Sequence, residues 1–184
     1  IVFNEKLVTI DSKSFSNNNL PGITLPENLV SVGSEAFRNN LLTSIELPAN
    51  VEIVGAMAFD NNLLSSIKFS NKMEIINEAV FRYNKLTSVE IPENIIEISS
   101  SGFAYNQLQT LEIPSKLATL RRGSFAFNQI KQISFSKSIE TIESYAFYSN
   151  MLQKVEIPEN ISIIEPYVFA KNKIVEVTIP EKIT

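Results

Sequence analysis

The chain has 184 residues, of which 44% are hydrophobic and 20% are charged, and its formal net charge is −4. It contains no histidine and no cysteine, which removes the commonest catalytic bases, nucleophiles and soft-metal ligands and leaves no disulfide or thiol chemistry. The slightly acidic charge and the scattered lysines and arginines argue against nucleic acid as a partner, and no apolar run is long enough to insert into a membrane.

A fixed period of 22 residues organises the whole chain. Phenylalanine recurs with this spacing, and an asparagine follows each phenylalanine three residues later. The two columns are Phe15, Phe37, Phe59, Phe81, Phe103, Phe125, Phe147 and Phe169, and Asn18, Asn40, Asn62, Asn84, Asn106, Asn128, Asn150 and Asn172. An unbroken period of this kind predicts a solenoid, in which each unit buries its apolar face by stacking on its neighbours. We therefore expect residues 1–184 to form one elongated domain.

The first element of each repeat is a short strand with the pattern LxxIxL, as at Leu42, Ile45 and Leu47. Proline follows the strand in most repeats. These prolines are Pro26, Pro48, Pro92, Pro114, Pro158 and Pro180. Because proline lacks an amide proton and has a fixed φ, it favours the end of a strand over its centre.

The next segment has apolar residues three apart, as at Val51 and Val54, which predicts an inward-turning arc. A small residue then precedes the phenylalanine, as in Ala58-Phe59, and we expect a short helical or 3₁₀ turn there. One helical turn is wider than the roughly 4.8 Å between neighbouring strands, so the stack should curve. The predicted fold class is α/β: a right-handed, curved solenoid of eight 22-residue repeats, with a parallel sheet on the concave face and short helical or 3₁₀ turns on the convex side.

The asparagine column is interpreted as structural. A tight turn leaves backbone amides and carbonyls without ladder partners, and an asparagine side chain supplies both a donor and an acceptor. Stacked asparagines are expected to bond their own turn and that of the adjacent repeat. Amide oxygens without accompanying carboxylates make a poor cation cage, so we expect neither a metal nor another cofactor.

The repeat LxxIxLPxN(V/I)xxIxxxAFxxNx resembles the leucine-rich repeats of the BspA-like type, also called the Treponema pallidum type, over essentially the whole chain. The matching pieces include Leu42 to Pro48, Val51, Val54, Ala58-Phe59 and Asn62. The resemblance implies a module of bacterial cell-surface or secreted proteins, many of which are adhesins that engage host proteins, other bacteria or extracellular matrix. We therefore expect a non-catalytic protein-binding or adhesion module, extracellular or on the bacterial cell surface, with a host or matrix protein as its partner. A structural spacer that displays another domain is the alternative.

The concave strand face is the first candidate binding surface, because its outward positions form polar columns. The candidate residues are Ser44, Glu46, Ser66, Lys68, Ser88, Glu90, Thr110, Glu112, Gln132, Lys154 and Glu156. Neighbouring strands place such side chains roughly 5 Å apart, so Lys68 is expected to bridge Glu46 and Glu90, while Glu90 and Glu112 repel each other. The face is either a solvated sheet surface or a docking surface for a protein that carries a basic patch.

The second candidate surface is an aromatic edge formed by Tyr83, Tyr105 and Phe127, which stand two residues after their repeat's phenylalanine. Exposed aromatic residues are enriched in interface anchors and sugar-stacking platforms. The alternative is that the three rings stack on one another and shield the core.

Catalysis would have to come from carboxylates or serines alone, and no residue is singled out as catalytic. The chain begins on strand residues and closes in mid-repeat at Ile183-Thr184 without a polar capping repeat, so we expect an excerpt of a longer protein. Uncovered ends are also expected to promote end-to-end association.

Overall fold

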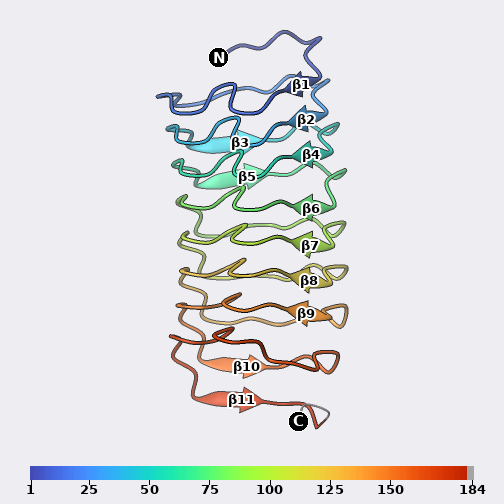
Figure 1. The fold of residues 1–184 in the computed structure, drawn as a ribbon, viewed down its shortest axis with the longest axis vertical. Helices are drawn as coiled ribbons and strands as arrows, with labels where there is room; N and C mark the ends of the chain where they lie inside the picture. The colour runs from blue at the N-terminus through green and yellow to red at the C-terminus, as the bar shows by residue number, and fades with distance from the viewer. Residues whose placement is uncertain (182–184) are drawn as a thin grey trace.

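The computed structural model describes residues 1–181, which form a column of stacked coils with one coil for each 22-residue repeat (Figure 1). The two ends of the chain lie at opposite ends of the column. The predicted solenoid of stacked repeats is thereby confirmed. Ile183 and Thr184, at which sequence analysis placed the end in mid-repeat, lie outside the described residues.

The first strand row is formed by the LxxIxL segments. It contains β3 (Ser44–Glu46), β5 (Ser66–Lys68), β10 (Lys154–Glu156) and β11 (Glu176–Thr178). All pairs in the row are parallel, with partners such as Ile45 and Ile67 that are one repeat apart. The proline after a strand begins a turn, in which Val51 N donates to Pro48 O at 3.0 Å.

A second strand row runs along the column and was not predicted as strand (Figure 1). It contains β1 (Thr9–Ile10), β2 (Ser31–Val32), β4 (Ile53–Val54), β6 (Ile75–Ile76), β7 (Glu97–Ile98), β8 (Thr119–Leu120) and β9 (Thr141–Ile142). These strands lie in the segment interpreted as an inward-turning arc. Their second residue is buried in the core, as sequence analysis expected, but the first points outward.

The expected helical or 3₁₀ turns are not found in residues 1–181, so the α/β assignment is wrong for the described chain. The residues two before and two after each phenylalanine have positive φ, as at Glu35 (57°) and Asn39 (55°), and this breaks any helical run. The amide of Phe37 donates to Ala58 O of the next coil at 2.8 Å instead of to its own chain four residues back. Hydrogen bonds between coils therefore replace the helix.

The curvature predicted for the solenoid depended on the greater width of a helical turn. Without that turn the argument for a concave strand face loses its basis, and the coils form a straight column in the view of Figure 1. We therefore refer to the former concave face as the first strand row.

The core is a continuous stack of phenylalanines, as the sequence predicted. From Phe15 to Phe169, rings of neighbouring coils lie 5.4–5.9 Å apart at their centroids and within 16° of parallel. Phe37 to Phe147 are fully buried in this column. Each ring is thus covered on both faces by its neighbours, which explains why a single repeat has no core of its own.

The asparagine column forms the expected ladder. Asn84, which is 3% exposed, donates to Phe81 O of its own turn (3.1 Å) and to Phe59 O of the adjacent turn (3.0 Å). Its Oδ1 accepts from Leu64 N at 2.9 Å. The column therefore joins successive turns and satisfies backbone groups that the core has removed from water.

Replacing Asn84 by leucine is expected to lower the free energy of unfolding by about 1–3 kcal/mol, because Leu64 N–H would stay buried without a partner. The carbonyls of Phe59 and Phe81 would each lose one of two asparagine donors and keep the other, from Asn62 and Asn106 respectively. Urea unfolding followed by circular dichroism measures the change. Asn28→Leu is the control, since Asn28 is exposed and donates a single bond, to Glu5 O. An equal loss in both variants would contradict a structural role for the column.

Ser124 breaks the pattern of satisfied polar groups. It is fully buried, and its hydroxyl has no hydrogen-bond partner among the described residues. Alanine occupies the same repeat position at Ala36, Ala58 and Ala146.

Ser124→Ala is therefore expected to stabilise the protein by about 1 kcal/mol, since it removes an unpaired buried hydroxyl. Thermal unfolding should show a higher Tm. Ser65→Ala, which removes a hydroxyl that donates to Thr43 O at 3.1 Å, should leave Tm unchanged or lower it. A lower Tm for Ser124→Ala would show that the hydroxyl is bonded in solution.

Candidate functional site

The strand-row surface consists of the eleven polar candidates predicted from the sequence, Ser44 to Glu156, on the first strand row. All of them are exposed. Residues in β3, β5 and β10 alternate with buried neighbours such as Ile45 and Val155, which hold the backbone against the core. The pleat thus directs the polar side chains into solvent.

Cations on the strand-row surface are paired with their neighbours. Lys68 bonds Glu46 across β3 and β5, and this hydrogen bond raises the pKa of Lys68. Lys154 contacts Glu176 at 2.9 Å and Glu156 at 3.1 Å, and the hydrogen bond to Glu176 is the main cause of its raised pKa. The expected bridge from Lys68 to Glu90 is wrong, because the described residues contain no ion pair between these two side chains.

The predicted Lys68–Glu90 ion pair does not form because the first strand row is interrupted between these two residues. Parallel pairing ends at β5, and the segment around Glu90 forms no strand. The next contact of the row is an isolated bridge between Glu112 and Ser134. Glu90 and Glu112 therefore occupy the part of the row where the coils are least tightly paired, and the described residues provide no ion-pair partner for either carboxylate.

A groove of about 1,100 Å³ opens at the C-terminal part of this surface. Its lining includes the predicted Gln132, Lys154 and Glu156 together with Phe135 and Ile157. Sequence analysis did not single out Phe135, whose repeat has Phe-Ser in place of the usual Leu-Pro or Ile-Pro. In this groove, the polar side chains of the strand-row surface thus lie beside the apolar side chains of Phe135 and Ile157.

The aromatic edge has the geometry of a stack. Tyr83 and Tyr105 have ring centroids 4.4 Å apart, and Tyr105 and Phe127 have centroids 4.3 Å apart. The rings remain 38–44% exposed. They stack on one another, as the alternative interpretation expected, and they also present their edges to solvent.

An ionic ladder was missed by the sequence analysis. Asp60, with a side chain only 2% exposed, bonds Arg38 Nε at 3.1 Å and Arg82 Nε at 2.9 Å, and Arg38 also bonds Glu35 at 2.8 Å. Arg38, Asp60 and Arg82 occupy one repeat column with alternating charge, which was the available signal. Hydrogen bonds to Glu35 and to Asp60 raise the pKa of Arg38 and Arg82, respectively. The ladder ties three coils together.

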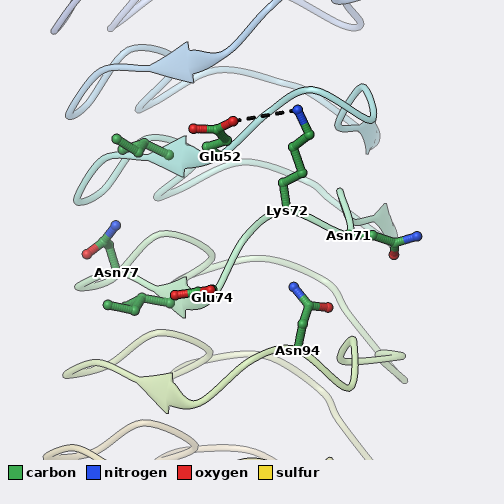
Figure 2. A pocket seen from close by; sticks show the side chains of 8 residues that line it. Glu52, Asn71, Lys72, Glu74, Asn77 and Asn94 are labelled. Carbon is green, nitrogen blue, oxygen red and sulfur yellow. Dashed lines mark ion pairs between the residues drawn. The ribbon is translucent and has the colours of Figure 1, made fainter.

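A smaller depression of about 580 Å³ lies beside the second strand row and was also missed (Figure 2). The outward side chains of Ile53 and Ile75 line it together with Glu52, Lys72 and Glu74. Figure 2 shows Lys72 extending toward Glu52, with a separation of 3.6 Å between the charged atoms. The site is open and already internally paired.

Residues 1–181 contain neither a cluster of metal ligands nor a membrane-spanning helix. No group of three or more acidic, histidine or cysteine side chains there is arranged to hold a metal ion. The same residues contain no helix long and apolar enough to cross a membrane.

Stacked coils with parallel strand rows and a buried asparagine column define a leucine-rich-repeat solenoid. The family model described as BspA type Leucine rich repeat region matches residues 1–108 and 74–184, and the chain belongs to this family. Leucine-rich-repeat proteins are commonly protein-interaction modules and generally non-catalytic scaffolds, and those of the BspA type are typically bacterial surface or secreted proteins. No curated protein matches the chain.

Solved structures share the fold at low sequence identity. A leucine-rich repeat protein from Bacteroides ovatus has a TM-score of 0.84 and 22% identity, covering 99% of this chain and 55% of that one. The pneumococcal vaccine antigen PcpA gives 0.55 and 22%, with 98% and 62% covered, and a Shigella effector LRR domain gives 0.60 and 20%, with 87% and 68% covered. The chain thus spans little more than half of the Bacteroides protein, and these likenesses concern the fold alone.

Glu97 provides a test of the electrostatics between neighbouring coils of the second strand row. Arg121 donates to its carboxylate at 3.0 Å and holds the pKa of Glu97 below the usual 4.5, and the Ser99 hydroxyl acts in the same direction. A depressed folded-state pKa contributes stability that is complete above the unfolded pKa and is lost as pH falls through the folded value.

Glu97→Gln should therefore be about 1 kcal/mol less stable than the wild type at pH 7. The difference should shrink below about pH 4.5 and disappear in stronger acid. Urea unfolding at a series of pH values measures it. The exposed Glu140→Gln serves as the control, and a Glu97→Gln deficit that persists unchanged into acid would contradict the assignment.

Proposed function

We propose that this chain is a non-catalytic protein-binding or adhesion module of a bacterial cell-surface or secreted protein, and that its strand-row surface contacts the partner. The observation that carries the proposal is the exposure of polar side chains at the same repeat positions of successive coils, on a backbone held by hydrogen bonds between coils. Such a surface loses little conformational entropy on binding, so its affinity comes from preorganisation and a few anchors.

Charge supports a partner with a basic patch. Glu46 and Glu156 are paired with lysines, whereas Glu90 and Glu112 have no ion-pair partner among residues 1–181. A basic partner would gain most at these two carboxylates, and their charge would steer the encounter and set specificity. The groove beside Gln132 and Lys154 adds apolar contact area from Phe135 and Ile157.

A structural spacer that displays another domain is the second candidate. The observation that favours it is that Lys68 pairs with Glu46 and Lys154 pairs with Glu176. These ion pairs neutralise part of the strand-row surface. A spacer needs a rigid column and no recognition surface, so it should tolerate charge changes on any face.

The test compares Glu90→Lys/Glu112→Lys with the matched control Glu74→Lys/Glu140→Lys, which makes the same charge change at exposed positions outside the first strand row. Attachment of the purified chain to animal cells, bacteria and immobilised extracellular-matrix proteins is measured at low and high salt. We expect the first variant to lose about tenfold or more in attachment and the control to retain it. Equal attachment by wild type and both variants would favour the spacer, and equal loss in both variants would refute a specific strand-row surface.

A further inference from the structure

We propose a second binding surface, separate from the strand-row surface, that takes an extended polypeptide segment rich in aspartate and glutamate. It follows the phenylalanine turns of the five coils that contain Phe81 to Phe169. We call it the cationic edge and define it by six aromatic and five cationic residues. These are Tyr83, Tyr105, Phe127, Tyr145, Tyr148 and Tyr167, with Arg82, Lys85, Arg122, Lys171 and Lys173.

The aromatic part of this edge is continuous and extends beyond the three residues found from the sequence. The stack that ends at Phe127 continues to Tyr148, with centroids 5.3 Å apart and rings inclined at 70°. Tyr148 lies 5.3 Å from Tyr145, which stacks on Tyr167 at 4.8 Å. Residues from different repeat positions thus form one surface, because Tyr148 contacts both Phe127 and Tyr145.

Cations cover the ring faces that the stack leaves open. Arg82 lies 5.2 Å from the centroid of Tyr83, Arg122 lies 4.9 Å from Tyr145, and Lys171 lies 5.2 Å from Tyr148. These distances are those of cation–π contacts. A face of each of these three rings is therefore occupied, and the ring edges and the tyrosine hydroxyls remain for a partner.

In these coils, the segment that follows each phenylalanine carries charge of one sign. In the five coils, the six residues after each phenylalanine include Arg82, Lys85, Lys131, Lys171 and Lys173 and no acidic residue, although the chain as a whole carries −4. Asp60 already pairs with Arg82. Glu143 accepts from Arg121 and from the backbone amide of Arg122, and Glu165 accepts from the backbone amide of Ser144, so these carboxylates are already engaged by groups of the chain.

The fold does not require aromatic residues at this edge. Tyr83, Tyr105 and Phe127 have φ of 54–56°, a region that bulky side chains disfavour. Asn39 and Asn61 occupy the same turn position in earlier coils, where asparagine tolerates positive φ and forms an amide ladder at 2.7–2.9 Å. The change from asparagine to aromatic residues therefore coincides with the cationic surface and is not needed to build the turn.

The geometry selects the chemistry of the ligand. Nucleobases bind by stacking on an open aromatic face, and at Tyr83, Tyr145 and Tyr148 a cation covers a ring face. Aromatic edges carry the positive part of the ring quadrupole, so edges, hydroxyls and cations together favour carboxylates. A polypeptide also brings backbone amides and carbonyls, which the half-buried carboxamides of Gln107 and Gln129, two residues beyond Tyr105 and Phe127, can bond.

The test measures binding of fluorescent poly-L-glutamate to the folded chain by anisotropy at low and moderate salt. The edge variant Lys85→Gln/Lys171→Gln/Lys173→Gln is compared with Lys6→Gln/Lys116→Gln/Lys137→Gln, which loses the same charge at exposed positions elsewhere. We expect the edge variant to bind about tenfold more weakly than the wild type and the control to stay within about threefold. Equal weakening in both variants would refute a specific edge.

A second variant separates recognition from bulk charge. Tyr83→Asn/Tyr105→Asn/Phe127→Asn installs the residue of the earlier coils, so the turn should fold while the aromatic edge is lost. We expect weaker binding of poly-L-glutamate with an intact unfolding transition. If this variant bound poly-L-glutamate as tightly as the wild type, the three aromatic rings would have no part in recognising the ligand.

Two further measurements fix the ligand class and the independence of the surface. Wild type that binds heparin or single-stranded oligothymidylate but not poly-L-glutamate would overturn the assignment to a polypeptide. The strand-row variant Glu90→Lys/Glu112→Lys should bind poly-L-glutamate at least as well as the wild type. Loss of binding in that variant would show that the two surfaces are one.

Discussion

The structure depends on one constraint, which is that every coil must meet its neighbours in a 22-residue hydrogen-bonded register. The turn amides donate to the carbonyls of the next coil, and the buried asparagines bond their own turn and the adjacent one, as Asn84 does with Phe81 and Phe59. One added or missing residue would shift these donors out of reach. Because the bonds are buried, the cost would fall on groups that water cannot satisfy. Length is therefore fixed per coil, while the outward side chains stay free to vary.

The outward side chains of the turns differ from coil to coil along the column. The position two residues after each phenylalanine carries asparagines in the first coils and aromatic residues from Tyr83 to Phe127, always at positive φ. The preceding position carries the Arg38–Asp60–Arg82 ladder over the same coils. Two arginines offset the desolvation of the nearly buried Asp60, which a single partner at the surface would do less well. The edge changes from amide and ionic bonding to aromatic stacking without any change in the path of the backbone.

The inward-facing features could be predicted from the sequence because they repeat without exception, as the phenylalanine and asparagine columns do. The second strand row was missed because its strands are two residues long and their outward residues, such as Thr9, Ile53 and Glu97, share no chemistry. The turns were mistaken for helical ones because positive φ leaves no signature when residues such as Met57, Ala79 and Tyr145 adopt it. The groups at the edge lie in several columns, so only three-dimensional contact joins Tyr148 to Phe127.

The net charge conceals how charge is distributed on such a column. On the strand row, Glu90 and Glu112 have no ion-pair partner among the described residues, whereas the turns of the same region carry Arg82, Lys85 and Arg122. Exposed charges act over roughly a Debye length of 8–10 Å at physiological salt, so a partner that approaches one face senses mainly the charges of that face. A chain judged by its total of −4 would be expected to repel every acidic ligand. The backbone, fixed by buried hydrogen bonds, keeps the unpaired carboxylates of the strand row apart from the basic residues of the turns, so the two surfaces we propose can select different partners.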